Sequence, residues 1–324
     1  MADHRNEYRP EQTGMYELEF PAPQLSSPDG RGPVMIHALE GFSDAGHAIR
    51  LSARYLRDSL DTELVASFAV DELLDYRSRR PLMMFKTDHF TKYEDPELRL
   101  YALHDSVGTP FLLLAGLEPD LKWDRFVTAV RLLAERLGVR QTIGLGTIPM
   151  AVPHTRPVTM TAHANNKELI AEHQPWVGEV QVPSSASNLL EFRMAQHGHE
   201  VVGFTVHVPH YLAQTDYPEA AEALLAEVSK VASLRIPLEA LSKAAAEIRM
   251  KINEQVESSP EVAQVVAALE RQYDAFIAAQ ENRSLLARDE ELPSGEEIAG
   301  EFERFLAQQT GDFSDGFRDG DDNN

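Results

Sequence analysis

Residues 110–116 read PFLLLAG, and this run is apolar along nearly its whole length. A strand with one solvated face alternates apolar and polar residues, whereas a strand covered on both faces is apolar throughout. Helices packed on both sides of a sheet provide such cover. We therefore expect this segment to be a central strand of a sheet that lies between two layers of helices.

Outward from this strand, short apolar runs alternate with segments of helical periodicity as far as Ile236. This alternation is typical of strands and crossover helices that build a mostly parallel sheet, so we predict a three-layer α/β/α sandwich. The expected strands are residues 16–20, 34–39, 63–69, 83–85, 98–103, 111–114, 142–145, 158–161, 180–182 and 201–208. The expected helices are residues 44–60, 123–137, 185–197 and 220–234. Gly138 and Gly198 stand where a left-handed residue ends a helix.

The pattern changes after Ile236. A helical stripe from Leu241 to Ile252 is followed by Ser258-Ser259-Pro260, which supplies an N-cap and a first-turn proline for a second helix. This helical hairpin is expected to pack on the domain or on another subunit. The predicted regions are a disordered N-terminus (1–14), an α/β/α domain (15–236), a helical extension (237–309) and a disordered acidic tail (310–324).

The composition excludes several classes of function. The 324 residues include no cysteine, which rules out disulfides, thiol nucleophiles and Cys-ligated zinc, and the net charge of −22 repels nucleic acid and anionic membranes. No apolar run approaches a membrane span, and residues 1–14 lack the apolar core of a signal peptide. We expect a cytoplasmic protein with neither nucleic-acid nor membrane partners.

The segment GFSDAGHA, residues 41–48, resembles two functional loops and matches neither. A phosphate-binding loop needs lysine after its second glycine, and His47 stands there; a hydrolase elbow needs its second glycine two residues after serine, and Gly46 lies three after Ser43. We interpret the segment as a strand-to-helix bend in which Gly41 ends the strand, Ser43 or Asp44 caps the helix and Gly46 permits close packing. Because such bends hold ligands in open α/β sheets, it remains a candidate ligand or interface loop.

Histidines and serines elsewhere suggest no catalytic or metal site. His207 and His210 would lie on opposite faces of a strand unless Pro209 bends the chain, and hydrogen bonding in a loop or at a strand end explains them better than metal ligation. Ser184 and Ser185 precede a helix in PSSASNLLEF, where a serine N-cap and Glu191 suit a helix start. No catalytic residue, cofactor or metal is assigned.

A charged segment forms the second candidate site. DELLDYRSRRP, residues 71–81, intersperses acidic residues with arginines, and its candidate protein-interaction residues are Asp75, Tyr76, Arg77, Arg79 and Arg80. Such a mixture is either a solvated ion-pair surface or a subunit or partner interface that uses arginine for specificity. The sequence leaves both interpretations open.

Six ordered blocks resemble the PAC2 family of proteasome-assembly-chaperone-2-like proteins, especially its longer actinobacterial members. The blocks are EGFSDAGHAIRLSARYL, DELLDYRSRRP, GLEPDLKWDRFVTAV, LGTIPMAVPHTRPVTMTAHA, PSSASNLLEFRMAQHGHE and GFTVHVPHYLAQTDYPEAAEALL, within residues 15–280. The resemblance implies an α/β/α fold like that of nucleoside phosphorylases and peptidyl-tRNA hydrolases, oligomer formation and, for archaeal and eukaryotic relatives, a role in proteasome assembly. It supplies no catalytic residues. Related chaperones dock on the proteasome through a C-terminal hydrophobic-Tyr-any tripeptide, which the final Asp322-Asn323-Asn324 does not match. Any such contact is therefore expected to use another surface or a partner protein.

Two functions follow as hypotheses. The first is a non-enzymatic homo-oligomeric scaffold or assembly chaperone, a small ring such as a trimer, with proteasome subunits or other proteins as partners. The second is a small-molecule enzyme or nucleoside- or phosphate-binding protein that uses the sheet, with residues 41–47 and the loops around His154–His163 or His207–His210 lining its pocket. Fold alone does not decide between them, because function resides in a site.

Overall fold

A computed structural model describes residues 14–286, except 20–22, 24, 26–29, 42 and 175–178. The N-terminal segment before Gly14, the acidic tail and the end of the predicted helical extension lie outside the described residues. Strands β1 to β10 are Tyr16–Leu18, Val34–Glu40, Asp61–Phe68, Met83–Lys86, His89–Tyr93, Leu98–His104, Pro110–Leu117, Gln141–Met150, Met160–Ala164 and Glu200–Pro209. Helices α1 to α7 are Ala48–Ser59, Val70–Leu73, Trp123–Arg136, Ala186–Gln196, Pro218–Ala232, Glu239–Ser258 and Pro260–Leu286. Short 3-10 turns η2, η3 and η4 are Ala45–His47, Lys167–Ile170 and His210–Leu212.

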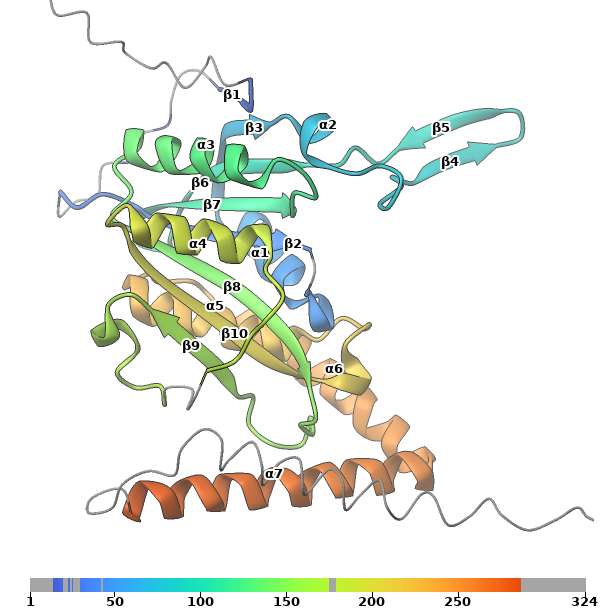
Figure 1. The fold of residues 1–324 in the computed structure, drawn as a ribbon. Helices are drawn as coiled ribbons and strands as arrows, with labels where there is room; N and C mark the ends of the chain where they lie inside the picture. The colour runs from blue at the N-terminus through green and yellow to red at the C-terminus, as the bar shows by residue number, and fades with distance from the viewer. Residues whose placement is uncertain are drawn as a thin grey trace, which may run out of the picture. The chain divides into compact units, whose positions relative to one another are not determined.

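Eight strands form one mixed sheet in the order β1-β3-β6-β7-β2-β8-β10-β9 (Figure 1). The four inner strands β7, β2, β8 and β10 are parallel, and the outer strands pair antiparallel with their neighbours. β7 contains the PFLLLAG run, and its first six residues are buried. The prediction that this run forms a central, doubly covered strand is confirmed.

Two hydrophobic cores lie on opposite faces of the sheet. Ile36 and Ala38 of β2 pack with residues of α1 and α5 in one core, whereas Met35 and Leu39 pack with residues of α3 and α4 in the other. This alternation along one strand follows from the two-residue period of the β-structure. The three-layer α/β/α prediction is therefore confirmed.

The described residues divide into two compact units. The first holds the sheet, α1 to α6 and α7 as far as Arg271, and the second holds residues 179–182 and 272–286. Within the first unit, α6 packs on its own chain, because Leu241 and Ile252 are buried in the same core as α5. The Ser259 hydroxyl accepts a hydrogen bond from the Val262 amide at 3.4 Å, which confirms the predicted start of the second helix.

The hairpin β4–β5 forms a separate two-stranded sheet that extends away from the main sheet in Figure 1. Its second strand, β5, was not expected from the sequence. The strand predicted at 180–182 is wrong: these residues form no strand, and Val180 and Val182 are each 63% exposed. Of the helices that the structure describes, none combines the length and hydrophobicity needed to span a bilayer.

Candidate functional site

The predicted loop at 41–47 forms the connection between β2 and α1. The Asp44 carboxylate accepts hydrogen bonds from the backbone N–H groups of Ile49 at 2.8 Å and Arg50 at 3.3 Å, so the capping prediction is confirmed for Asp44. Ser43 instead donates its hydroxyl to the Thr147 carbonyl on β8. Burial raises the pKa of Asp44, although these two N–H bonds oppose the shift.

Each glycine of this loop allows a close approach. A Cβ atom on Gly41 would lie 1.8 Å from Oε2 of the buried Glu118, and one on Gly46 would lie 2.9 Å from Cβ of Tyr217. Gly46 also has a φ of +68°, a conformation that favours glycine. His47 contacts Asp216 through Nδ1 at 2.8 Å. The loop is therefore packed against the connection that follows β10, and its role as a ligand or interface loop remains a prediction.

Asp44→Ala is expected to lower the free energy of unfolding by about 1–2 kcal/mol, because it leaves two first-turn amides of α1 without their acceptor. Urea denaturation measures this loss. Asp58→Ala is the control: Asp58 is exposed on the same helix and pairs with Arg54 at 3.3 Å, an i,i+4 contact worth about 0.5 kcal/mol or less. Equal losses in the two variants would contradict the capping role.

A row of two histidines and two glycines runs across four neighbouring strands of the sheet, where each residue pairs with the next in the strand register. His37 of β2 pairs with Gly144 of β8, Gly144 with Gly203 of β10, and Gly203 with His163 of β9. A Cβ atom at Gly144 would lie 1.9 Å from Oε1 of Glu191, and one at Gly203 would lie 2.3 Å from the His163 ring. The two glycines thus leave the space in which the Glu191 carboxylate reaches the sheet from α4.

Glu191 bridges the two histidines. Its Oε2 accepts a hydrogen bond from Nε2 of His163. Its Oε1 lies 3.3 Å from Nε2 of His37, close enough for an ion pair but not aligned for a hydrogen bond. Burial raises the pKa of Glu191, but the contacts with His163 and His37 outweigh it and hold the pKa at about 2. The hydrogen bond to Glu191 raises the pKa of His163 against burial. The carboxylate is therefore ionised near neutral pH.

Ser187 extends this row toward the N-terminus of α4. Its hydroxyl lies 3.0 Å from Nδ1 of His37, which places serine, histidine and glutamate in sequence, as in acyl-transfer enzymes. Acyl transfer also needs donors for an oxyanion. The Ser187 amide instead donates to Oε1 of Glu118 at 3.1 Å, so this N–H group is already engaged and is not free to bind an oxyanion. The arrangement favours a helix pinned to the sheet over a catalytic triad.

Sequence reasoning did not identify this row. It named His163 but not His37 or Ser187, and it assigned Glu191 to the start of α4. That assignment is wrong: the hydroxyl of the N-cap, Ser185, accepts a hydrogen bond from the Asn188 amide at 3.1 Å, and Glu191 points to the sheet. Glycines inside predicted strands were the available signal, because they often mark a close approach of another group.

The charged segment at 75–80 lies between α2 and β4. Arg79 pairs with Asp120 at 2.5 Å, and Asp120 also accepts from the Asp75 amide at 2.9 Å. Tyr76 donates to Asp71 at 2.5 Å, and this hydrogen bond raises the pKa of Tyr76 to about 12.

Arg77 and Arg80 in this segment are exposed. Arg79 thus fixes the segment within the chain, while Arg77 and Arg80 face solvent beside the β4–β5 hairpin. The binding of a protein partner by these residues stays a prediction.

The other predicted histidines and serines have structural partners. His207 contacts the hydroxyls of Thr159 and Thr161, each at 2.9 Å, and burial lowers its pKa. His210 lies beside the Tyr211 ring, with 5.4 Å between ring centroids. Ser184 donates to the Ser185 carbonyl at 3.4 Å. Within the described part of the chain, no group of three or more His, Asp or Glu residues is placed to hold a metal ion.

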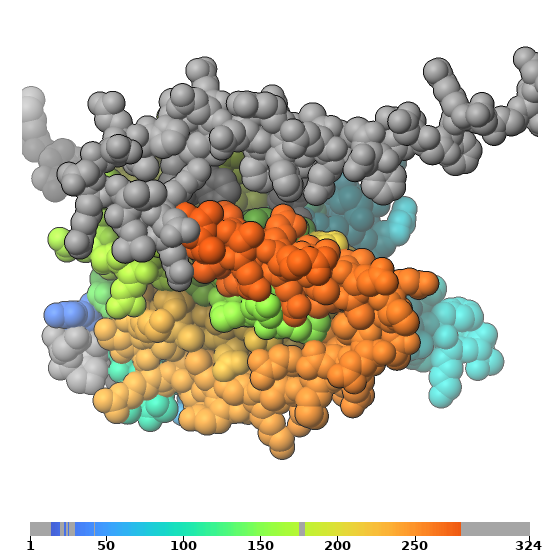
Figure 2. Space-filling view, turned by 90° about the horizontal axis from the view of Figure 1, so that it is seen from below, coloured from blue at the N-terminus to red at the C-terminus, as the bar shows by residue number. Residues whose placement is uncertain are grey.

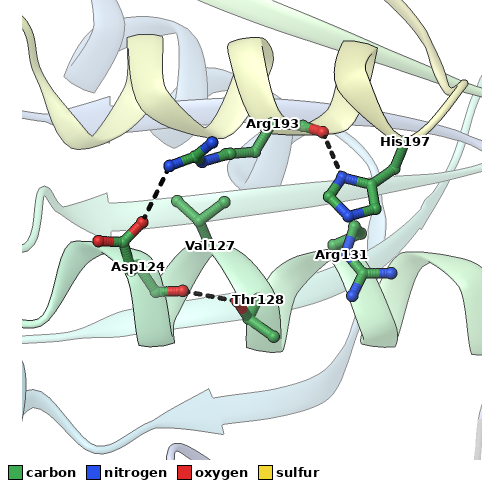
Figure 3. Close-up of a pocket in the computed structure, with 6 residues that line it drawn as sticks. All are labelled: Asp124, Val127, Thr128, Arg131, Arg193 and His197. Carbon is green, nitrogen blue, oxygen red and sulfur yellow. Dashed lines mark hydrogen bonds and ion pairs between the residues drawn. The ribbon is translucent and has the colours of Figure 1, made fainter.

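A small hollow of about 160 Å³ lies between α3 and α4 (Figure 3). Asp124 pairs with Arg193 at 3.5 Å across the two helices, and His197 donates to the Arg193 carbonyl at 2.8 Å. Small-molecule sites usually measure about 300–1,000 Å³. This hollow is therefore better explained as part of the contact between the two helices.

Comparison with known proteins places the chain in a family. The family model described as "PAC2 family" matches residues 38–256. The structures similar to this chain include a Mycobacterium tuberculosis protein of unknown function, which is 80% identical, with a TM-score of 0.83 and coverage of 86% of this chain and 95% of that one. They also include a Corynebacterium glutamicum protein of unknown function, 44% identical, with a TM-score of 0.79 and coverage of 82% and 98%.

A third similar structure is a Mycobacterium tuberculosis proteasome-assembly chaperone homologue. It is 24% identical, with a TM-score of 0.66 and coverage of 72% of this chain and 99% of that one, and at this identity the likeness shows the fold alone. A comparison with curated protein sequences found no match. Because the family model matches well over half of the residues, the chain belongs to the PAC2 family.

Proposed function

We propose that this chain is a cytoplasmic, non-enzymatic scaffold that forms homo-oligomers and binds other proteins, with a role linked to proteasome assembly. Family membership supports the class of function. The proposal of a homo-oligomer rests on one observation in particular, the exposed apolar side chains of the β4–β5 hairpin.

This hairpin surface is unusual for a chain that stays monomeric. Its exposed large apolar side chains are Leu82, Met83, Met84, Phe85, Phe90 and Tyr93, and each is between 42% and 69% exposed. Phe85 and Phe90 stack edge to face with 5.2 Å between ring centroids. Exposed aromatic and Met side chains gathered on one short element are typical of protein–protein interfaces, in which these residue types are enriched.

The charges favour a second copy of this chain as the partner that covers the hairpin. Arg77 and Arg80 are exposed next to the hairpin, whereas the whole chain carries a net charge of −22. Arginines beside an apolar patch would therefore meet an acidic surface on another protomer, and complementary charge sets the register of an interface. A closed ring, such as a trimer, would bury one hairpin per protomer.

The double variant Phe85→Ser with Phe90→Ser is expected to dissociate the oligomer, with a loss of roughly 2 kcal/mol or about thirty-fold in dissociation constant. Size-exclusion chromatography with light scattering measures the mass. Phe192→Ser is the matched control, because Phe192 is similarly exposed, at 58%, but lies on α4. A monomeric wild-type chain, or an oligomer unaffected by the double variant, would contradict the proposed role of the hairpin.

The proteasome link has a separate test, because only a relative's description supports it. Purified proteasome subunits are mixed with the wild-type chain, and complexes are separated by sedimentation. Co-sedimentation of at least one subunit with the wild type is expected. If no subunit co-sediments with the wild type, the proteasome link fails while the oligomeric scaffold stands on its own test.

A further inference from the structure

An open pocket of about 470 Å³ lies beyond the ends of β8 and β10, in the first compact unit. Its walls come from the segment between β8 and β9, the start of α5, and α6, and its lining residues are His154, Thr155, Arg156, Pro157, Glu219, Arg249 and Asn253. Its size falls within the range of about 300–1,000 Å³ that is usual for small-molecule sites. The carboxyl ends of parallel strands are where open α/β sheets bind ligands.

The pocket is rich in hydrogen-bond donors. Arg156 and Arg249 contribute guanidinium groups and Thr155 contributes a hydroxyl. Asn253 is oriented by the buried His154, because Oδ1 of Asn253 lies 3.0 Å from Nε2 of His154 while Tyr211 contacts Nδ1 at 2.6 Å. With its oxygen engaged, Asn253 adds an amide donor to the pocket.

Glu219 and Glu270, two carboxylates near the pocket, differ in how they are held. Glu219, at the start of α5, accepts from the Tyr217 hydroxyl at 3.1 Å and from Arg249 of α6 at 3.4 Å, so its carboxylate joins these two walls of the pocket. Glu270 comes from α7, and it accepts hydrogen bonds from the Thr155 hydroxyl and from Arg156 at 3.3 Å. Figure 2 shows the start of α7 in orange beside the green segment between β8 and β9. Glu270 thus presents an anion to donors that line the pocket.

We propose that this pocket binds a small molecule through an oxyanion, either a phosphate or a carboxylate, and that Glu270 occupies the position of that oxyanion when no ligand is present. Guanidinium groups match the geometry of both kinds of anion. An incoming anion displaces Glu270 from Thr155 and Arg156, so binding loosens the start of α7. By linkage, holding α7 in place weakens ligand binding by the same factor. This inference goes beyond the proposed scaffold function and does not depend on it.

Isothermal titration of the full chain with inorganic phosphate and, separately, with citrate tests the proposal and distinguishes the two kinds of oxyanion. Glu270→Gln is expected to raise the affinity for the preferred anion roughly five-fold, because the competing charge is removed. Arg249→Gln is expected to lower it about ten-fold. Glu261→Gln is the control, because it removes one charge from an exposed position on the same helix, and its affinity should equal that of the wild type.

Hydrogen exchange supplies a second readout. In the wild type, the preferred anion should speed exchange of the amides in residues 260–271, and in Glu270→Gln the exchange should already be fast without ligand. Two results would overturn the proposal. The first is the absence of binding in Glu270→Gln up to about 20 mM of either anion. The second is an affinity that Glu270→Gln and Arg249→Gln leave unchanged.

Discussion

Gly144→Ala is expected to lower the free energy of unfolding by about 3–5 kcal/mol, a loss typical of breaking a buried charge pair. The new Cβ atom would lie 1.9 Å from Oε1 of Glu191 and 2.8 Å from the His37 ring, so either the carboxylate leaves the sheet or β2 and β8 move apart. His37 is fully buried and cannot turn toward solvent. Urea denaturation followed by circular dichroism measures the loss.

Gly198→Ala provides the control for this variant. Gly198 has a φ of +82°, and no atom lies within 4 Å of the place that a Cβ would take, so alanine there costs only the left-handed backbone conformation, about 1 kcal/mol. The difference between the two variants isolates the contact with Glu191. If Gly144→Ala costs no more than Gly198→Ala, the carboxylate does not depend on the space above β8.

Glu191→Gln is expected to cost about 3 kcal/mol near pH 6 and to flatten the acid side of the stability profile. The pKa of Glu191 is held at about 2 in the folded chain against an ordinary value of 4.5. Every tenfold change in proton affinity corresponds to about 1.4 kcal/mol. Because the folded pKa is lowered, the stabilisation is complete above pH 4.5 and is lost as the pH falls toward 2.

The dependence of stability on pH should also change on the alkaline side in Glu191→Gln. The pKa of His163 is raised in the folded chain. The stabilisation from its charged ring is therefore fully present below pH 6.5, its ordinary pKa, and is lost as the pH rises through the folded pKa. In Glu191→Gln this loss should disappear, because glutamine carries no charge to hold the imidazolium. Denaturation curves at closely spaced pH values across the acid and alkaline ranges give both effects.

Glu254→Gln is the matched control for these curves, because Glu254 is exposed on α6. It should leave the profile of the wild type unchanged. Parallel profiles for the wild type and Glu191→Gln, differing by a constant offset, would show that the carboxylate contributes packing alone and that its charge does not matter.

Gly144→Ala and Glu191→Gln both act on the row of residues that joins α4 to the sheet. Glu191 and His37 lie between a helix and the middle of the sheet, and the amide of Ser187 faces Glu118. Such a row fixes α4 against the parallel strands.

Features that depend on neighbours along the chain were predictable from the sequence. The apolar run at 110–116 identified the central strand because burial on both faces removes every polar residue. Gly138 and Gly198 end α3 and α4 with φ values of +68° and +82°, and Asp44 and Ser259 cap the helices that follow them. Each of these roles requires only a few consecutive residues.

Tertiary structure alone decided the rest. Four strands adopt the register that pairs His37 with Gly144, Gly144 with Gly203 and Gly203 with His163. No pattern within any one segment specifies which residues of distant strands will pair. The pocket beside Glu270 joins segments that lie far apart in the sequence. Residues 180–182 alternate like a strand yet form none. Local chemistry determines where strands and helices begin and end, whereas charge pairs, pockets and strand partners depend on packing between distant segments.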